Sequence, residues 1–414
     1  MKSLKIGFIG SGFIAHFLAK AMKQVRRVEL TAIFNNNGSE DLAAFAKTNK
    51  LGQPVVCDTI REVCEKSDAV AILTPNFTRI KIMQEIAESV LSGVPLTGVI
   101  CEKPLARTIQ EATEMVDLAA SANLLTAYFE NQLHAPAINK ALKQLEPQMR
   151  AMGNITLARS TEEHSGPHST WFWDPMKQGG GVLSDMGCHS IAASRHILTP
   201  PEKGPLFLEP VSVQADTSLL KWGREKYRKQ LKEKFGVDYS ITPAEDFCTG
   251  TINYKNPETG RHVKSQFTVS WMYDKQGLRI LMEGLGPGYA FEMNSLRSPS
   301  EIFIGDEAAE AVADSEEALE KSTSSRGLLP LQPNEADLYG YVAEIEDMRD
   351  AFLAGKNAML DWNYGKEITM LCQACYLSAE KGQTVKLSNP IVQQELETYR
   401  SLISRGEGAE VLLG

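Results

Sequence analysis

The sequence predicts an α/β protein of two domains: a doubly wound parallel sheet, followed by an α+β domain with a large, mostly antiparallel open sheet. Three observations lead to this prediction. The chain has 414 residues, more than one hydrophobic core usually serves, and 43% of them are hydrophobic. Strand-like and helix-like segments alternate as far as residue 130. Longer strand-like segments follow in residues 131–414.

Six strands alternate with five helices in the first 130 residues. The strand-like segments are short aliphatic or β-branched runs at 4–10, 28–34, 54–58, 69–73, 96–101 and 124–129. Amphipathic helical segments begin at or near Phe13, Ser39, Thr59, Thr78 and Thr108. This alternation predicts a sheet of parallel strands with helices on both faces, that is, a Rossmann domain over residues 1–130.

Glycine and polar residues follow the carboxyl ends of these strands. Because a doubly wound sheet binds its ligands at that edge, these residues are candidates for a binding site. The candidates are Gly10, Gly12, Asn35, Thr74, Pro75, Asn76, Glu102, Lys103 and Glu130.

The most informative pattern is G-x-G-x-x-A at Gly10, Gly12 and Ala15, between the first strand and the first helix. Gly10 permits a tight turn, Gly12 lets backbone amides approach a pyrophosphate, and the small Ala15 lets the helix pack closely. Phe13 and Ile14 open a helix whose N-terminus would face the phosphates. A glycine-rich turn without a ligand is the alternative, but its place in the alternation favours a dinucleotide site.

The end of the second strand bears on which dinucleotide binds. An acidic residue there holds the ribose hydroxyls of NAD, and a nearby arginine accommodates the 2′-phosphate of NADP. This chain has Asn35 at that position, followed by Asn36 and Asn37, and so carries neither signal. We expect NAD or NADP, with NAD slightly favoured.

Lys103 follows an apolar strand and precedes Pro104, which favours an extended backbone. Its ammonium should then point into the crevice. There it can hydrogen-bond a substrate oxygen and stabilise negative charge that develops on that oxygen. A surface lysine before a turn is an equally good reading of the position alone.

The stretch GGGVLSDMGCHSI, residues 179–191, places Asp185 and His189 four residues apart. On a helix this spacing brings both side chains to one face. An imidazole can take the proton of an alcohol as hydride leaves, and a carboxylate can hold a substrate hydroxyl. The glycines Gly179–Gly181 would let the backbone approach a ligand or the nicotinamide. The alternative is a glycine-rich turn before a helix with Asp185 in its first turn and a packed His189.

The order of G-x-G-x-x-A, T-P-N, E-K-P and G-G-G-x-x-x-D-x-G-x-H resembles the glucose-fructose oxidoreductase, inositol dehydrogenase and MocA (Gfo/Idh/MocA) family of NAD(P)-dependent sugar and polyol oxidoreductases. Residues 344–387 also resemble that family's closing helices and last strand. The resemblance implies that His189 is the acid/base, that Lys103 binds the reacting hydroxyl, and that Asp185 positions the substrate. It implies a cofactor site at Gly10, Gly12, Thr74, Asn76, Glu102 and Lys103.

Two positions depart from the family pattern. Members often carry histidine three residues after the asparagine of T-P-N, where this chain has Arg79. Many NAD users carry an acid where this chain has Asn35. The first departure leaves a local cofactor or helix-capping contact open, and the second leaves the choice of cofactor open.

The second domain begins with a linking helix near 133–145 and continues with strands at 153–162, 247–254, 263–272, 278–286 and 290–294. These strands predict a mostly antiparallel sheet. Two stretches look inserted. Residues 220–238 are charged and helical in pattern, and residues 306–327 are acidic and serine-rich, as in a solvated loop.

Residues 162–174, EEHSGPHSTWFWD, are rich in histidine and tryptophan. Aromatic faces bury the C–H surface of sugar rings and imidazoles hydrogen-bond hydroxyls, so His164, His168, Trp171 and Trp173 are expected to bind substrate. A metal site is the sharper alternative, but Gly166–Pro167 breaks the spacing that would align the histidines, and we expect none. Packing of the tryptophans under a loop or at a subunit contact is the third reading.

Composition limits the partners. A formal net charge of −9 argues against nucleic acid and against an anionic membrane surface. Seven scattered cysteines are typical of reduced thiols in a cytoplasmic protein, and Cys372 and Cys375 should face a core. No apolar run reaches the roughly 18 residues of a membrane helix, and the chain enters a strand pattern at once, without a signal peptide.

The sequence therefore predicts an NAD(P)-dependent oxidoreductase that acts on a secondary alcohol of a sugar, polyol or glycoside. Two alternatives use the same fold: a redox-neutral glycoside hydrolase or lyase that oxidises and re-reduces its substrate, and a regulator that binds a dinucleotide without turnover. The family resemblance also implies a homodimer or homotetramer that forms through the exposed sheet of the second domain.

Overall fold

The structure is a computed structural model that describes residues 2–36, 38–275, 277–297, 301–304, 327–330 and 334–413. The chain divides into two compact units. Unit 1 comprises Met1–Pro136 and Ala336–Thr369, and unit 2 comprises Ala137–Glu335 and Met370–Gly414. Residues 336–369, which follow the second domain's strands in the sequence, thus belong to unit 1. The acidic stretch at 306–327 lies outside the described residues, apart from Gly327.

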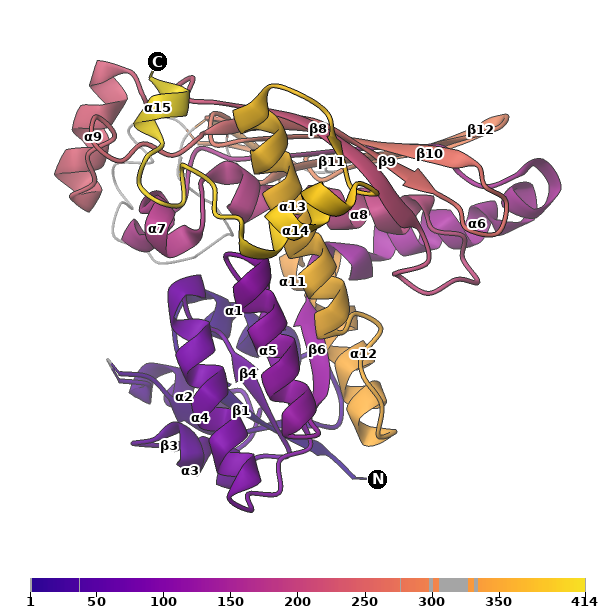
Figure 1. Ribbon diagram of the computed structural model, residues 1–414. Coiled ribbons are helices and arrows are strands. Elements are labelled where there is room, and N and C mark those ends of the chain that lie inside the picture. The colour runs from indigo at the N-terminus through magenta and orange to yellow at the C-terminus, as the bar shows by residue number, and fades with distance from the viewer. Residues whose placement is uncertain are drawn as a thin grey trace. The chain divides into compact units, whose positions relative to one another are not determined.

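Unit 1 contains the predicted doubly wound sheet. Its six strands are parallel and lie in the order β3-β2-β1-β4-β5-β6 (Figure 1). The strands are β1 Leu4–Ile9, β2 Val28–Phe34, β3 Val55–Val56, β4 Ala69–Ile72, β5 Gly98–Glu102 and β6 Leu125–Phe129. Every residue of β4 and β5 is buried, as expected for central strands covered on both faces. The predicted six-stranded parallel sheet is confirmed.

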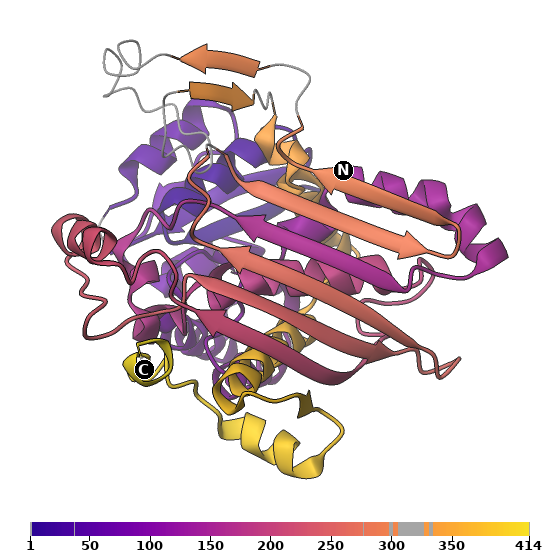
Figure 2. The ribbon, with the colours of Figure 1, turned by 90° about the horizontal axis from the view of Figure 1, so that it is seen from above.

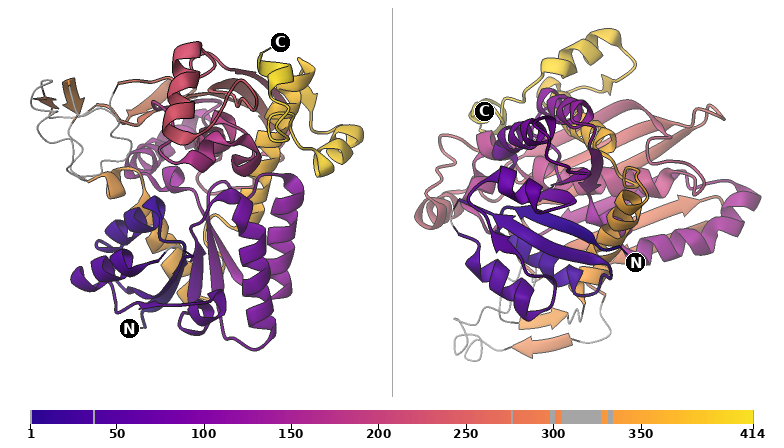
Figure 3. Two further views of the ribbon diagram at one scale, coloured as in Figure 1. Left: turned by 90° about the vertical axis from the view of Figure 1, so that its left-hand side faces the viewer. Right: turned by 90° about the horizontal axis from the view of Figure 1, so that it is seen from below.

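Helices lie on both sides of this sheet, as the left view of Figure 3 shows. They are α1 Phe13–Met22, α2 Glu40–Thr48, α3 Ile60–Glu65, α4 Arg79–Leu91 and α5 Ile109–Ser121, with short 3₁₀ turns η1 Asn76–Thr78 and η2 Asn131–His134. Thr59 and Thr108 cap α3 and α5, since each hydroxyl accepts a hydrogen bond from a backbone N–H in the first turn. A later helix, α12 Tyr341–Leu353, packs against α1 and against strands β1 and β6.

Unit 2 is built on a seven-stranded mixed sheet in the order β12-β11-β7-β10-β9-β8-β15 (Figure 2). Only β7 and β10 pair in parallel among the described strands of this sheet, and the other neighbours are antiparallel. The strands are β7 Leu157–Glu163, β8 Glu209–Ser218, β9 Phe247–Lys255, β10 His262–Ser270, β11 Arg279–Gly286, β12 Tyr289–Asn294 and β15 Val385–Lys386. The mostly antiparallel sheet is thus confirmed, although the sequence analysis missed β8.

Helices cover one face of this sheet. The central one, α8 Cys188–Leu198, packs on β7, β10 and β11, and every residue except His196 is buried. The remaining helical elements between residues 136 and 330 and after residue 386 are α6 Pro136–Met152, η3 Thr170–Trp173, α7 Pro175–Gln178, the π-helical turn η4 Leu183–Gly187, α9 Glu225–Phe235, α14 Pro390–Thr398 and α15 Ala409–Leu412. Helix α9 confirms the helix predicted within residues 220–238.

Two strands and two helices complete the description. Strands β13 Glu301–Ile304 and β14 Gly327–Pro330 pair in a separate two-stranded sheet. Helices α11 Glu335–Leu338 and α13 Trp362–Lys381 each contain a boundary between the two units.

All seven cysteines are buried and none forms a disulfide, and Cys372 and Cys375 lie in the core as predicted. Within the described part of the chain, every helix is too short or too polar to cross a lipid bilayer.

Candidate active site

The turn between β1 and α1 has the geometry of a phosphate site. Gly10 has φ +110°, and a Cβ there would lie 2.8 Å from the carbonyl oxygen of Leu73. Gly12 is the N-cap of α1 and makes no side-chain cap, and a Cβ at Gly12 would meet no atom within 4 Å. Phe13 and Ile14 lie in the first turn of α1. Ala15 is fully buried, and its small side chain lets the helix pack closely there. Backbone N–H groups at this helix start are therefore available to a pyrophosphate, which fits the dinucleotide that the sequence predicts.

The loop after β2 is held by two side chains. The Asn35 amide donates to the Gly38 carbonyl oxygen over 3.0 Å, and the Ser11 hydroxyl donates to the same oxygen over 2.8 Å. Asn35 thus lies beside the glycine turn, as the sequence placed it. Its amide carries no charge that would exclude a 2′-phosphate.

Arg79 holds the segment that carries Lys103. Its buried guanidinium donates to the carbonyl oxygens of Thr74 (3.1 Å), Glu102 (2.6 Å) and Lys103 (3.4 Å), and also to that of Pro104. The Lys103 backbone N–H donates to the Phe129 carbonyl oxygen over 3.1 Å. These bonds fix the backbone on both sides of Lys103 and connect it to the Thr74–Asn76 turn.

Three buried carboxyl groups surround this segment. Glu102 ends β5, Glu130 follows β6, and Glu344 lies on α12. Burial raises the pKa of Glu102 to about 7 and that of Glu130 to about 8, while the positive charge of Lys103 lowers both. Burial, together with the charges of Glu102 and Glu130, raises the pKa of Glu344 well above its usual value. The Lys103 ammonium therefore lies within electrostatic reach of Glu102 and Glu130.

These carboxyl groups should make stability fall as pH rises. A carboxyl whose pKa is raised on folding stabilises the protein most below its unfolded value, about 4.5 for Glu130, and loses that contribution as pH rises through about 8. Glu130→Gln should flatten the fall between pH 5.5 and 8.5, and Glu102, Glu344 and the buried Glu245 should contribute to what remains. Thermal unfolding midpoints at the two pH values check this. An equal fall in the variant and the wild type would contradict it.

Asp185 and His189 lie on consecutive helical elements. The four-residue spacing suggested one helix for both residues, and the structure divides them: Asp185 lies in the π-helical turn η4, and His189 is the second residue of α8. Both side chains are buried. Single π-helical turns are uncommon and occur often at functional sites.

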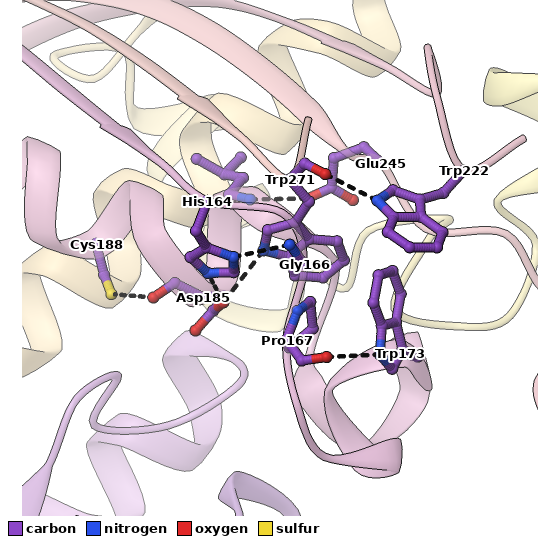
Figure 4. Close-up of polar contacts among 10 residues, drawn as sticks. His164, Gly166, Pro167, Trp173, Asp185, Cys188, Trp222, Glu245 and Trp271 are labelled. Carbon is purple, nitrogen blue, oxygen red and sulfur yellow. Dashed lines mark hydrogen bonds and ion pairs between the residues drawn. The ribbon is translucent and has the colours of Figure 1, made fainter. Parts of the chain in front are cut away.

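Two aromatic side chains of unit 2 face the Asp185 carboxylate (Figure 4). The Trp271 indole N–H donates to Asp185 Oδ2 over 3.2 Å. The Gly166 backbone N–H donates to His164 Nδ1 over 2.9 Å, so the proton of a neutral His164 ring sits on Nε2. That Nε2 lies 3.8 Å from Asp185 Oδ2. Both rings therefore present N–H groups to the same carboxylate oxygen.

Two of the three glycines before Asp185, Gly180 and Gly181, lie close to other protein groups. A Cβ at Gly180, where φ is +147°, would lie 1.9 Å from the Tyr376 hydroxyl oxygen. A Cβ at Gly181 would lie 2.2 Å from the Glu245 carbonyl oxygen. The expectation that these glycines clear room for a ligand is therefore replaced, at both positions, by close packing on Glu245 and Tyr376.

The His/Trp stretch divides into buried and accessible residues. Trp173 is 1% exposed, packs edge-to-face on Trp222 and Trp271, and donates its N–H to the Pro167 carbonyl oxygen over 3.1 Å. His164 is also buried, whereas His168 is exposed and Trp171 is half-exposed. The packing alternative thus describes Trp173. Contact of these four residues with a substrate stays a prediction.

A pocket of about 640 Å³ lies between the His/Trp stretch and the charged stretch at residues 220–238. Residues 165–167 and Trp173 line it on one side, and Lys221, Trp222 and side chains of α9 line it on the other. The Lys221 ammonium pairs with Asp274 and lies 4.9 Å from the Trp222 ring centre. Aromatic walls with a few polar groups, at this volume, are typical of small-molecule sites.

Comparison with known proteins agrees with this geometry. Residues 4–130 match the family model described as "Oxidoreductase family, NAD-binding Rossmann fold", and residues 148–284 match the GFO/IDH/MocA C-terminal domain. The chain belongs to the Gfo/Idh/MocA family. The resemblance inferred from the motifs is confirmed.

Two Gfo/Idh/MocA relatives are similar in sequence. A levoglucosan dehydrogenase of Pseudarthrobacter phenanthrenivorans is 31% identical over 217 residues, 48% of this chain and 52% of the relative. A D-glucoside 3-dehydrogenase of Escherichia coli is 27% identical over 256 residues, 61% of this chain and 67% of the relative. The first alignment thus spans about half of the relative's length.

The fold also matches solved structures. The crystal structure of GenD2 from gentamicin A biosynthesis, in complex with NAD, has a TM-score of 0.72 at 20% identity and covers 94% of this chain and 97% of that chain. This similarity shows that the two chains share a fold over nearly their whole lengths.

Within this Gfo/Idh/MocA chain, several residues of the site escaped the sequence analysis. Arg79 was noted only as a departure from the family pattern. In the structure it donates hydrogen bonds to the main-chain oxygens of the E-K-P segment. Glu245 and Trp271 were not singled out, since no motif marks them. Glu163, in the His/Trp stretch, accepts a hydrogen bond from the Ser270 hydroxyl over 2.8 Å and pairs with Arg279.

Proposed function

We propose that this protein is an NAD(P)-dependent oxidoreductase that transfers hydride between a secondary alcohol of a sugar, polyol or glycoside and a nicotinamide. One observation carries the proposal: the Gly10–Gly12 turn leaves the start of α1 without a side-chain cap, in a chain of the Gfo/Idh/MocA family. The relatives named above are dehydrogenases of sugars and glycosides, which favours net oxidation or reduction over a redox-neutral reaction and over a regulator.

Three side chains have separate roles in the proposed reaction. A dinucleotide held at the Gly10–Gly12 turn and the start of α1 would supply the hydride acceptor for the carbon of the alcohol. Lys103 donates a hydrogen bond to the alcohol oxygen and stabilises the charge that develops there. His189 accepts the hydroxyl proton as the C–O bond becomes a carbonyl, and Asp185 binds a neighbouring hydroxyl and holds the substrate in register.

We favour NAD as the cofactor, because the family model describes an NAD-binding fold and no arginine follows β2 to hold a 2′-phosphate. Because Asn35 is not an acid, we expect NADP to bind at the same site, with lower affinity than NAD. Dissociation constants for the two cofactors measure this preference directly.

The 640 Å³ pocket supports a glycoside as substrate, with its second ring or aglycone against Trp222. Trp222→Ala should raise KM for glycosides roughly ten-fold, equivalent to about 1.4 kcal/mol, and leave KM for the free monosaccharide unchanged. Steady-state kinetics with the paired substrates check this. The monosaccharide is the internal control for folding, and an equal change in both KM values would contradict a ring subsite.

We also propose a homodimer or homotetramer. Helix α8 covers one face of the seven-stranded sheet and leaves the other face open (Figure 2). The polar residues Arg159, Gln214 and Gln266 line a shallow pocket on this sheet. The mass of the purified protein by light scattering should be two or four times that of the 45.6 kDa chain. A mass of one chain at micromolar concentration would contradict the proposal.

The test of the main proposal is absorbance at about 340 nm, the band of the reduced nicotinamide, with NAD or NADP and a panel of polyols, aldoses, sugar acids and glycosides. A rise with one compound class would establish the reaction and the cofactor together. Cofactor binding without turnover on any member of the panel, in either direction, would contradict the proposal.

A further inference from the structure

We propose that Glu245 and Tyr376 are positioning residues for catalysis: together they anchor the segment 181–189, which carries Asp185 and His189. The proposal rests on the catalytic roles proposed above for these two residues. Neither Glu245 nor Tyr376 is part of a motif of the family pattern described above.

Glu245 alone accepts hydrogen bonds from three consecutive backbone N–H groups. Its carboxylate accepts from Gly181 (3.0 Å to each oxygen) and from Leu183 (3.0 Å), and its carbonyl oxygen accepts from Val182 (3.0 Å). The first N–H groups of a helix have no acceptor within the helix. At the start of η4, these N–H groups instead donate to Glu245, which lies 64 residues after Gly181 in the sequence.

Tyr376 completes the anchor from a third part of the chain. Its hydroxyl donates to Glu245 Oε1 over 2.7 Å and accepts from the Gly181 N–H over 3.2 Å. Both side chains are fully buried or nearly so, and both belong to unit 2. The position of the turn is therefore set by residues distant in sequence.

The glycines are what allows so close an anchor. With a side chain at position 180 the Tyr376 hydroxyl would have to move, and with one at position 181 the Glu245 backbone would have to move. Four residues after Gly181, the Asp185 N–H donates to the Gly181 carbonyl oxygen over 3.1 Å. Displacement of Gly181 thus reaches Asp185 through one hydrogen bond.

If the role were purely structural, a serine or asparagine side chain could cap the turn without the desolvation cost of a buried carboxyl group. Burying a carboxyl group is costly, and burial raises the pKa of Glu245 to about 7 even though the hydrogen bonds from Tyr376, Leu183 and Gly181 lower it. Such a group, satisfied by several donors at once, defines one geometry and resists alternatives. Geometry of this kind matters where Asp185 and His189 must meet a reacting group.

The test compares the full-length wild type with Glu245→Gln, Tyr376→Phe and the control Asn389→Ala. Asn389 caps α14 in the same unit, where its side chain accepts from the Ile391 N–H over 3.0 Å, so its loss also removes a helix cap. The measurements are amide hydrogen exchange of residues 181–189, kcat, KM and the dissociation constant of the cofactor.

We expect Glu245→Gln to speed exchange across residues 181–189 and to lower kcat at least ten-fold, with KM and cofactor affinity within about two-fold of the wild type. Tyr376→Phe should give a smaller change of the same kind, and Asn389→Ala should change neither property. Unchanged exchange in Glu245→Gln would overturn the anchor, and faster exchange with wild-type kcat would overturn its role in catalysis. If the wild type itself had no turnover, the proposed function would fail, and exchange alone would still decide whether the anchor exists.

Discussion

Replacing Lys103 by methionine should lower kcat by roughly 10² to 10³, because the alcohol oxygen loses the charged donor that stabilises it as hydride departs. Methionine keeps the length of the side chain and removes only the charge and the hydrogen bonds. Arg79 holds the backbone at residue 103 through main-chain oxygens, so the substitution should leave the segment in place. Steady-state kinetics with the best substrate of the panel measure the effect.

Lys81→Met is the matched control, since Lys81 is an exposed lysine on α4 of the same unit. It should leave kcat and cofactor affinity unchanged. The cofactor affinity of the Lys103 variant should fall less than its kcat, because the pyrophosphate contacts proposed here lie at the start of α1. A Lys103→Met enzyme with wild-type kcat would remove Lys103 from the mechanism.

The local parts of this protein could be predicted from sequence because each is encoded over a few neighbouring residues. The turn at Gly10–Gly12 lies between a strand and a helix that are both marked by short apolar patterns. Threonines 59 and 108 mark the helices that they cap. Strand β8 was missed because its residues alternate less clearly, with only Val213 fully buried.

The parts that could not be predicted depend on partners far apart in the chain. Trp271 and Asp185 are separated by 86 residues, and Tyr376 and Glu245 by 131. No periodic pattern links such pairs. The π-helical turn at Asp185 could not be predicted for the same reason, since the N–H of its first residue, Leu183, donates to Glu245, which is distant in the sequence. Trp173 illustrates a further limit: an aromatic side chain has the same sequence signature in a sugar site and in a packed cluster.

Replacing His189 by glutamine should lower kcat for alcohol oxidation by 10² to 10⁴, roughly the range that a positioned general base contributes. Glutamine can still hydrogen-bond but cannot accept a proton. His196→Gln is the control on the same helix, where the His196 ring pairs with Asn139 over 3.1 Å, and it should behave as the wild type.

The pH profile separates a proton acceptor from a packed histidine. If His189 takes the alcohol proton, oxidation by the wild type must slow at low pH, since a protonated imidazole has no lone pair to offer, and the Gln variant must lose this dependence. Reduction of the carbonyl should show the opposite slope, because the same group then donates the proton. A variant that is slow but keeps the wild-type profile in both directions would mean that His189 only supports the geometry around Asp185, and another group would have to carry the proton.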